Sequence, residues 1–387
     1  MKILHLSKFI LMKLSFSKIL VFSLLIFLFS CKNDQKNVEL AGKINTESTL
    51  KYAKGFDIQH FKNYTKLTVK APYQNSEEIF EFMLTHNKLN SDLNTIQIPI
   101  KSIVVTSTTH IPMLELLQVE NKLVGFPNTD YVSSPKTRSL IANGFVKELG
   151  HEESINTELL LDLKPDLVVG FSLNSNNKMF SVIEKLGIPV LLNGDWMEET
   201  PLGRAEWIKF FGVLFDKEKM ADSIFKTIEK NYLEAKNIAS KATENPTVIS
   251  GGLFKDVWNL PAGDSFEATF LKDANTNYLW KDSKGKGSLS LNIENVFEKG
   301  KDAELWISPS YYETMEQLND ANDIYPKFSA FQNKNIFTYV NKKGELGGII
   351  YFELAPARPD LVLKDLIKIA HPELLKNYDL TFYERLK

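Results

Sequence analysis

The stretch Asn156 to Gly170, NTELLLDLKPDLVVG, constrains the fold most, because it combines a capped helix, a proline stop and a buried strand. Asn156 is a favoured helix N-cap, and Glu158 places a carboxylate in the first turn, near the positive end of the helix dipole. Pro165 ends the helix, and the apolar run after it is typical of a strand covered on both faces. The stretch therefore predicts an α/β fold.

A second unit of the same design lies far downstream, in Asn292 to Ser308, NIENVFEKGKDAELWIS. Asn again precedes Glu by two positions, and Glu294 stands eight residues before Asp302, as Glu158 stands eight before Asp166. Asn-x-Glu is also ordinary helix-start chemistry, which any α/β chain could carry twice. Because the two units fall in different halves, we expect two lobes with one Glu at the same place on each.

The beginning of the chain is typical of an export leader. An apolar run from Ile19 to Phe29 has the length of a signal-peptide core and is too short to span a bilayer comfortably. Translation could start at Met1 or at Met12, which begins a more compact leader. The only cysteine, Cys31, follows Leu28-Phe29-Ser30, an order that resembles the lipobox of bacterial lipoproteins. The resemblance implies that the leader is removed before Cys31, which is lipidated and anchors the exported protein on the periplasmic side; the alternative is a small buried thiol.

Charge and motifs exclude several functional classes. Lys and Arg number 46 against 48 Asp and Glu, and removing the four leader lysines takes the formal charge from -2 to -6. Such a mildly acidic protein has no basic footprint for nucleic acid. The sequence has no GxSxG, HExxH, CxxC or GxGxxG motif, and its glycine-rich segment DSKGKGS lacks the spacing of a phosphate-binding loop.

The order of patterns along the chain indicates the organisation of the lobes. Alternation over residues 56–69 predicts two antiparallel strands joined around Lys62-Asn63. The buried run Ile103 to Thr106, the polar turn after it and a helix over 111–117 form a strand–turn–helix unit, so Thr106 to His110 are candidates for a cleft at the strand ends. About four strands complete the first lobe, and residues 127–144 are expected to form a long loop.

A long amphipathic helix is predicted over Lys217 to Lys241. A helix of roughly 25 residues spans about 37 Å, long enough to connect two lobes. The expected segments are a signal peptide (1–30), a lipidated tether (31–48), an N-terminal β extension (49–100), an N-terminal lobe (101–200), connecting helices (201–242) and a C-terminal lobe (243–387).

Five segments carry a family resemblance: SIVVTSTTHIPMLELL, VGF, INTELLLDLKPDLVVG, EKLGIPVLLN and ARPDLVLKDLIKIAHPEL. In this order and spacing they resemble the class III periplasmic substrate-binding proteins of ABC importers, which serve ferric siderophores, haem and cobalamin. The resemblance implies two Rossmann-like lobes, with parallel sheets flanked by helices, joined by one long stiff helix. It also implies a monomer that delivers its ligand to a permease dimer, with Glu158 and Glu294 docking on permease arginines.

Aromatic residues collect at the predicted strand ends and loops, where they suit large flat or greasy ligands. Arg358 could meet an anionic ligand or pair with Glu353, and His110 could bind a metal or be a hydrogen-bonded loop residue; we expect no protein-bound metal or cofactor apart from the ligand. The ligand-binding candidates are Thr108, His110, Tyr131, Phe171, Trp196, Trp258, Tyr311 and Arg358.

The sequence therefore predicts a lipid-anchored subunit of an ABC importer that captures a ferric siderophore, haem or cobalamin between its lobes and performs no chemistry. Two alternatives stay open. One is an exported α/β enzyme, since a fold does not fix a function. The other is a surface lipoprotein that scavenges haem or siderophores without a permease.

Overall fold

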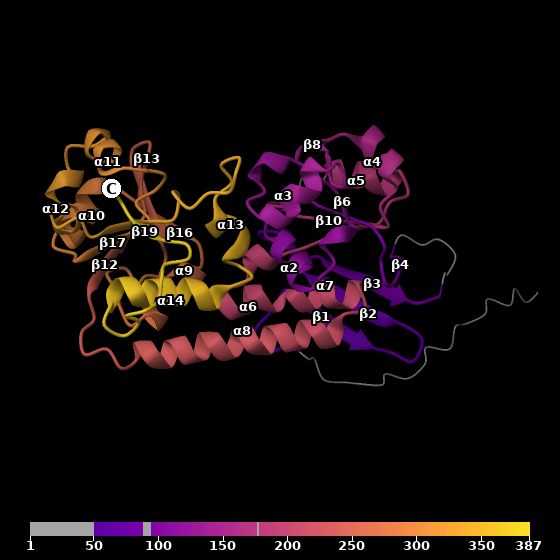
Figure 1. Ribbon diagram of the computed structural model, residues 1–387, viewed down its shortest axis with the longest axis horizontal. Helices are drawn as coiled ribbons and strands as arrows, with labels where there is room; N and C mark the ends of the chain where they lie inside the picture. The colour runs from indigo at the N-terminus through magenta and orange to yellow at the C-terminus, as the bar shows by residue number, and fades with distance from the viewer. Residues whose placement is uncertain (1–49, 88–93, 176–177) are drawn as a thin grey trace, which may run out of the picture. The chain divides into compact units, whose positions relative to one another are not determined.

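The computed structural model describes residues 50–87, 94–175 and 178–387, which all lie in the compact unit Lys43–Lys387. Two α/β lobes, a small β extension and a set of connecting helices make up this part of the chain (Figure 1). The predicted leader and Cys31 lie outside the described residues. Among the residues that are described, no helix has the length and apolar character needed to cross a membrane.

The N-terminal lobe contains a parallel sheet with the strand order β11-β10-β5-β6-β7. Its strands are β5 (Ile103–Val105), β6 (Leu123–Phe126), β7 (Lys147–Glu148), β10 (Leu167–Gly170) and β11 (Val190–Leu192). Its helices are α2 (His110–Leu116), α3 (Pro135–Ala142), α4 (Thr157–Leu163) and α5 (Lys178–Lys185), and β8 (Gly150–His151) pairs with β9 (Ser154–Ile155).

Two predictions for this lobe need correction. The expected four strands become five, because the two exposed residues of β7 are too short to give an apolar pattern. The expected long loop contains α3, which starts where the Ser134 side chain caps the backbone N–H groups of Lys136 and Thr137, with Pro135 in the first turn.

The two helix–strand units were predicted correctly. The Asn156 side chain accepts the backbone N–H of Leu159 at 3.0 Å, and Asn292 accepts that of Asn295 at 2.9 Å. The units end in the central strands β10 and β17 (Leu305–Ile307) of the two sheets.

The predicted correspondence between the acidic residues that precede these strands needs one correction. Asp166 precedes β10 and accepts the N–H of Lys101 at 2.6 Å, next to strand β5. Its counterpart is Glu304 rather than Asp302, because Glu304 accepts the N–H of Thr247 at 2.8 Å, at the start of strand β12. The two units are therefore equivalent in the Asn that caps each helix and in the acidic residue that precedes each strand. The number of residues between these two positions is not the same in both units.

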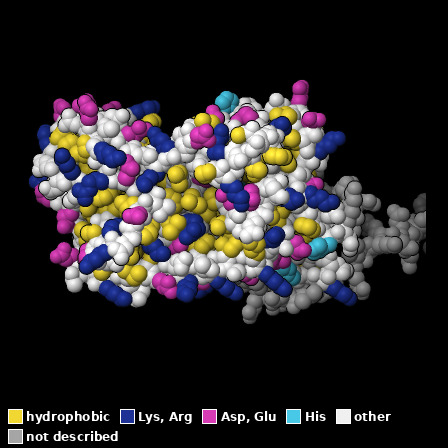
Figure 2. Space-filling view, viewed as in Figure 1, with side chains coloured by type: hydrophobic (Ala, Val, Ile, Leu, Met, Phe, Trp, Pro, Cys, Tyr) yellow, Lys and Arg dark blue, Asp and Glu magenta, His cyan; other side chains and the backbone are white. Residues whose placement is uncertain are grey.

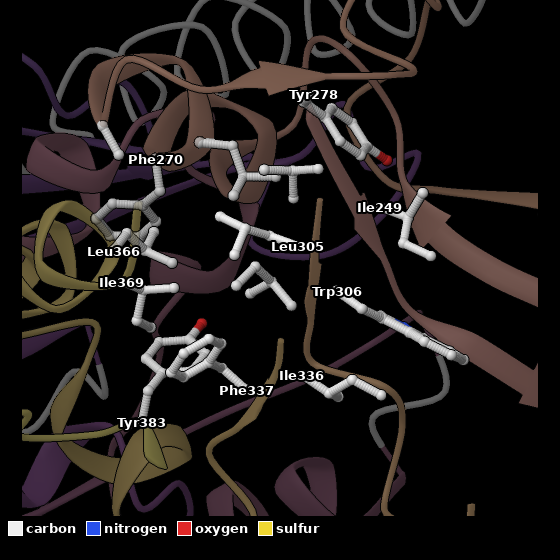
Figure 3. Close-up of a cluster of buried hydrophobic side chains, with 14 of the residues drawn as sticks. Ile249, Phe270, Tyr278, Leu305, Trp306, Ile336, Phe337, Leu366, Ile369 and Tyr383 are labelled. Atoms are coloured by element: carbon white, nitrogen blue, oxygen red, sulfur yellow. The ribbon is translucent and has the colours of Figure 1, made fainter. Parts of the chain in front are cut away.

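The C-terminal lobe contains a mixed sheet with the order β15-β12-β17-β18-β19, parallel except for β19. Its other strands are β12 (Thr247–Ser250), β15 (Asn277–Tyr278), β18 (Ile336–Thr338) and β19 (Glu384–Arg385), and an antiparallel sheet joins β13 (Gly252–Phe254), β14 (Val257–Pro261) and β16 (Ser288–Leu291). The helices are α9 (Phe266–Asp273), α10 (Ile293–Gly300), α11 (Met315–Ala321), α12 (Ser329–Gln332), α13 (Ile350–Leu354) and α14 (Pro359–Ala370). Figure 3 shows the core of this lobe, where Trp306 and Ile249 of the sheet lie among buried apolar side chains.

The β extension packs on the first lobe. Its sheet has the order β1-β2-β3-β4, with β1 (Phe56–His60), β2 (Thr65–Lys70), β3 (Ile79–Thr85) and β4 (Thr95–Gln97). β1 and β2 are antiparallel, as predicted, with Phe56 opposite Val69. The Phe56 ring lies 4.5 Å from the ring of Trp207, which places the extension on the core of the N-terminal lobe.

The connecting region consists of α6 (Pro201–Glu206), α7 (Ile208–Leu214) and the long helix α8 (Glu218–Ala239), close to the predicted span. The first half of α8 buries Phe225 and Ile228 in the core of the N-terminal lobe. Its second half buries Tyr232 and Ala239 in the core of the C-terminal lobe. One continuous helix therefore belongs to both cores, and Figure 1 shows it running beneath both lobes.

Helix α13 provides a second connection. Tyr351 belongs to the C-terminal core, while the buried carboxylate of Glu353 accepts the backbone N–H groups of Ser133 and Ser134 at 2.7 and 2.9 Å. Ser134 also donates to Glu115 of α2 at 2.6 Å. Burial raises the pKa of Glu353 to about 7, despite the two N–H groups that lower it, and the charge of Glu115 raises it further.

This raised pKa predicts a pH-dependent stability. Because native Glu353 holds its proton more tightly than the unfolded chain does, its stabilising contribution is complete below pH 4.5 and is lost as the pH rises through about 7. The loss should reach up to about 3 kcal/mol in the free energy of unfolding. Glu353→Gln cannot ionise, so its free energy of unfolding in urea, measured from about pH 4 to about pH 8 to span both pKa values, should change less with pH than that of the wild type. The exposed control Glu316→Gln should keep the wild-type slope, and an equal slope in both variants would contradict the assignment.

Candidate functional site

Three adjoining cavities of about 660, 380 and 510 Å³ are lined by residues of both lobes. The first two share Trp196, Arg204 and Glu267, and the last two share Thr108 and Phe171. We call the combined space the cleft. Figure 2 shows hydrophobic side chains gathered in the middle of the drawn face, where the lobes meet.

The wall from the N-terminal lobe is formed at the carboxyl ends of its strands. Residues 106–109 follow β5, and the Thr106 hydroxyl accepts the backbone N–H of Phe171, which follows β10, at 2.9 Å. The Thr109 hydroxyl donates to Asp195, beyond β11, at 3.0 Å. Three neighbouring parallel strands thus place short polar turns on one edge, where ligands bind in open α/β sheets.

Trp196 forms the next part of this wall, and the preceding Asp195 is buried and lines none of the three cavities. Burial raises the pKa of Asp195 to about 6, although the charge of Arg204 and the Thr109 hydroxyl lower it. In the described residues the Asp195 Oδ1 atom and the Trp196 indole N–H are buried without a hydrogen-bond partner. The Trp196 ring meets that of Phe171 edge-on at 5.8 Å. The wall therefore presents aromatic surface, and two polar atoms without a partner are buried at Asp195 and Trp196.

Arg204 lies at the base of the cleft. Helix α6, which carries it, is capped by Thr200 and contributes Leu202 to one core and Ala205 to the other. The guanidinium carbon of Arg204 stacks 3.5 Å from the ring of Phe266 on the opposite lobe. An Nη atom donates to the Trp196 carbonyl at 2.7 Å, and in the described residues no carboxylate forms an ion pair with the group. Arg204 thus presents a fixed positive charge that no direct ion pair neutralises.

Glu267, on α9, lines the same cavities as Arg204. Desolvation raises its pKa, and the nearby charge of Arg204 lowers it. Within the described parts of the chain its carboxylate has no hydrogen bond and no ion pair. The half-buried acid and the half-buried arginine therefore face one space without contacting each other.

The wall from the C-terminal lobe begins where β17 ends. Ser308 and Ser310 have positive φ angles of 57° and 71°, which strain a non-glycine backbone and turn the chain sharply. The following Tyr311 is 68% exposed and lines two of the cavities. Tyr339 lines the largest cavity and stacks on Tyr351 at 4.3 Å.

One ion pair crosses the largest cavity. Lys286, in the glycine-rich segment of the C-terminal lobe, contacts the carboxylate of Glu199, which also lies 3.4 Å from Lys54. Next to it, Glu198 accepts the backbone N–H groups of Lys54 and Gly55. The chain that follows the predicted tether is therefore fastened directly beside the cleft.

The predicted ligand-binding residues fall into two groups. Thr108, Tyr131, Phe171, Trp196 and Tyr311 line the cleft. The other three do not line the cavities described.

Trp258 and His110 are corrected to core residues. Trp258 is 0% exposed, stacks on Trp306 at 5.3 Å and donates to the Ser250 carbonyl. His110 is equally buried and lies 5.5 Å from the ring of Phe211, and burial lowers its pKa to about 3. Trp258 lies within β14 and His110 begins α2, and both side chains pack among buried apolar and aromatic groups rather than lining the cleft.

Arg358 is corrected to a structural residue. It donates two hydrogen bonds of 2.9 Å to Asp360 across the start of α14. The sequence left open a pair with Glu353, whose carboxylate instead binds the backbone of Ser133 and Ser134.

Glu158 and Glu294 are both exposed in the first turns of α4 and α10, one on each lobe, and neither lines the described cavities. Among the described residues no group of three or more His, Cys, Asp or Glu is arranged to hold a metal ion.

Sequence reasoning missed Arg204, Glu267 and Lys286. Arg204 and Glu267 lie in helices capped by Thr200 and Ser265. Thr108 was selected because it follows a strand, and candidates could also have been sought at the starts of helices. Lys286 belongs to the glycine-rich segment, which was excluded as a phosphate-binding loop because of its spacing. In the structure its side chain contacts Glu199 across the cleft.

Comparison with known proteins agrees with this architecture. The family model for periplasmic binding proteins matches residues 103–342. An uncharacterized lipoprotein of Methanocaldococcus jannaschii is 26% identical over 306 residues, covering 76% of this chain and 71% of that protein.

Two solved structures share the fold. A possible iron-binding periplasmic solute-binding protein from Staphylococcus epidermidis has a TM-score of 0.56 and 20% identity, covering 70% of this chain and 99% of that one. A periplasmic haem-binding protein of Vibrio cholerae has a TM-score of 0.53 and 16% identity, covering 68% and 99%. The chain thus belongs to the periplasmic binding protein family.

Proposed function

We propose that this protein is the lipid-anchored substrate-binding subunit of an ABC importer and captures an iron complex (a ferric siderophore or haem) or cobalamin in the cleft. The observation that carries the proposal is the cleft itself, a large space with aromatic and hydroxyl groups from both lobes and one arginine without an ion pair. The descriptions of the S. epidermidis and V. cholerae proteins as iron- and haem-binding support this ligand class.

The proposed roles follow from position. Trp196, Phe171 and Tyr311 offer ring surface to a flat or apolar ligand, and Thr108 offers a hydroxyl at a strand end. Arg204 holds a ligand oxygen, because its guanidinium is already fixed by Phe266 and the Trp196 carbonyl and loses little freedom on binding.

Ligand binding can be followed through Trp196, which is the one tryptophan lining the cavities described. Titrating the protein from Lys32 onward with a ferric hydroxamate, a ferric catecholate, haem and cyanocobalamin should quench its fluorescence with at least one ligand. Arg204→Gln should weaken that binding by about tenfold or more, since it removes a charge-assisted hydrogen bond. Trp196→Phe should remove most of the signal while competition still detects binding, and the absence of binding to all four ligands would refute the proposed ligand class.

We further propose that Glu158 and Glu294 dock the protein on the permease. Each lies in the first turn of an equivalent helix, exposed and away from the cleft. Two separate negative charges on one body fix the orientation of docking more than they add affinity.

The double variant Glu158→Arg with Glu294→Arg should bind ligand as the wild type does and lose uptake, because both docking charges are reversed. Uptake of the isotope-labelled ligand by cells measures this. The control pair Asp162→Arg with Glu298→Arg reverses exposed charges one turn further along the same helices and should retain most uptake. Normal uptake by the first pair would exclude the docking role.

The remaining proposal concerns the anchor. Cys31 follows an apolar leader, and the related M. jannaschii protein is described as a lipoprotein. Cys31→Ser should abolish incorporation of labelled fatty acid and move the protein from the membrane fraction to the soluble fraction. A Cys31→Ser variant that stays lipidated and membrane-bound would contradict the proposal.

A further inference from the structure

The charges of the cleft restrict which ligand it accepts, given the function proposed above. Its lining contains two cations, Arg204 and Lys286, and the four carboxylates Glu152, Glu198, Glu199 and Glu267. Lys286 is already paired with Glu199. Arg204 is therefore the one cation in the cavities described that has no ion pair, and the cleft as a whole is formally acidic.

The acids of the cleft are not all neutralised by protein contacts. The Glu198 carboxylate accepts hydrogen bonds from the backbone N–H groups of Lys54 and Gly55 and from the Trp207 indole N–H. Glu267 and Glu152 have neither a hydrogen bond nor an ion pair among the described residues. Desolvation raises the pKa of both carboxyl groups, because burial destabilises their charged forms.

The other polar groups of the lining are uncharged. Hydroxyl groups of Ser107, Thr108, Ser308, Ser310 and Tyr311 and the Asn259 amide face the same space. Such groups donate to and accept from amide, hydroxamate or hydroxyl oxygens and nitrogens, but they do not compensate several negative charges.

Arg204 and Glu267 together favour one orientation of a ligand in the cleft. They line the same two cavities without pairing with each other, so a ligand between them meets a donor on one side and an acceptor on the other. An amide or hydroxamate group offers a carbonyl oxygen and, in the amide, an N–H that match this arrangement. A polyanionic chelate meets one favourable charge and several unfavourable ones, and like charges brought together cost several kcal/mol.

We propose that the cleft selects a ligand of neutral or nearly neutral surface rich in amide or hydroxamate groups, and that Glu267 is the residue that rejects polyanionic chelates. A ferric trishydroxamate and a corrinoid share this surface chemistry, whereas a ferric triscatecholate is a trianion. The inference rests on the proposed function and specifies the substrate class of the same site.

The test compares two neutral probes, a ferric trishydroxamate and cyanocobalamin, with a trianionic ferric triscatecholate, which matches the trishydroxamate in iron coordination and differs from it in charge. Each is titrated against the wild type, Glu267→Gln and the control Glu316→Gln, which removes the same charge from an exposed helix outside the cleft. Equilibrium dialysis gives the dissociation constants, and circular dichroism verifies that the variants are folded.

We expect the wild type to bind one of the neutral probes at least about a hundredfold more tightly than the trianion. Comparing the two neutral probes shows whether the ligand is a hydroxamate chelate or a corrinoid. Glu267→Gln should gain about tenfold or more for the trianion, and Glu316→Gln should not.

Trianion binding by the wild type as tight as that of the neutral probes would overturn the inference and leave the importer function intact. A Glu267→Gln variant with unchanged trianion affinity would overturn the role of Glu267. Failure of all three probes, with haem still bound, would overturn the inference and leave the importer function intact. Failure of haem as well would overturn both the inference and the proposed ligand class.

Discussion

The burial of one helix in two hydrophobic cores is the constraint on which the rest of the structure depends. Helix α8 contributes Phe225 and Ile228 to the N-terminal core and Tyr232 and Ala239 to the C-terminal core. Bending it would expose apolar surface on one lobe or the other, at about 25 cal/mol for each Å² uncovered. Helix α6 repeats the arrangement on a smaller scale with Leu202 and Ala205, so the two lobes are connected by shared packing rather than by flexible strands.

A cleft built on such a frame can hold its binding groups in place before the ligand arrives. Arg204 stands on α6 and is stacked on Phe266 of the other lobe, while Lys286 and Glu199 meet across the largest cavity. Glu353 adds a contact away from the cleft, between α13 and the start of α3. Preorganised groups avoid the entropy cost of being ordered during binding. The chemistry of the cleft, aromatic and hydroxyl-rich with few cations, then decides what enters.

The sequence predicts the regular parts of this fold because their signals are local. The Asn caps of α4 and α10, the apolar runs of β10 and β17 and the long periodic pattern of α8 each depend on neighbouring residues. The same local reasoning placed Thr108 and Phe171 on the cleft, since both follow buried strands.

The sequence does not predict which side chains from distant segments share a space. Trp258 resembles a cleft aromatic in its context, yet it packs on Trp306 and Tyr325 in the core. Arg204 and Glu267 are far apart along the chain, and only the packing of α6 against α9 brings them to one cavity. The pairing of β14 with β16 was missed for a similar reason, because helix α9 separates the two strands in the sequence.

The distance between the two lobes tests the central claim, a rigid frame held by α8, most directly. Spin labels at Glu158→Cys and Glu294→Cys, in the protein from Lys32 onward, which has no native cysteine, report this distance by pulsed electron spin resonance. The account predicts one narrow distribution that changes little when ligand binds. A broad distribution, or a shift of many ångströms on binding, would contradict it.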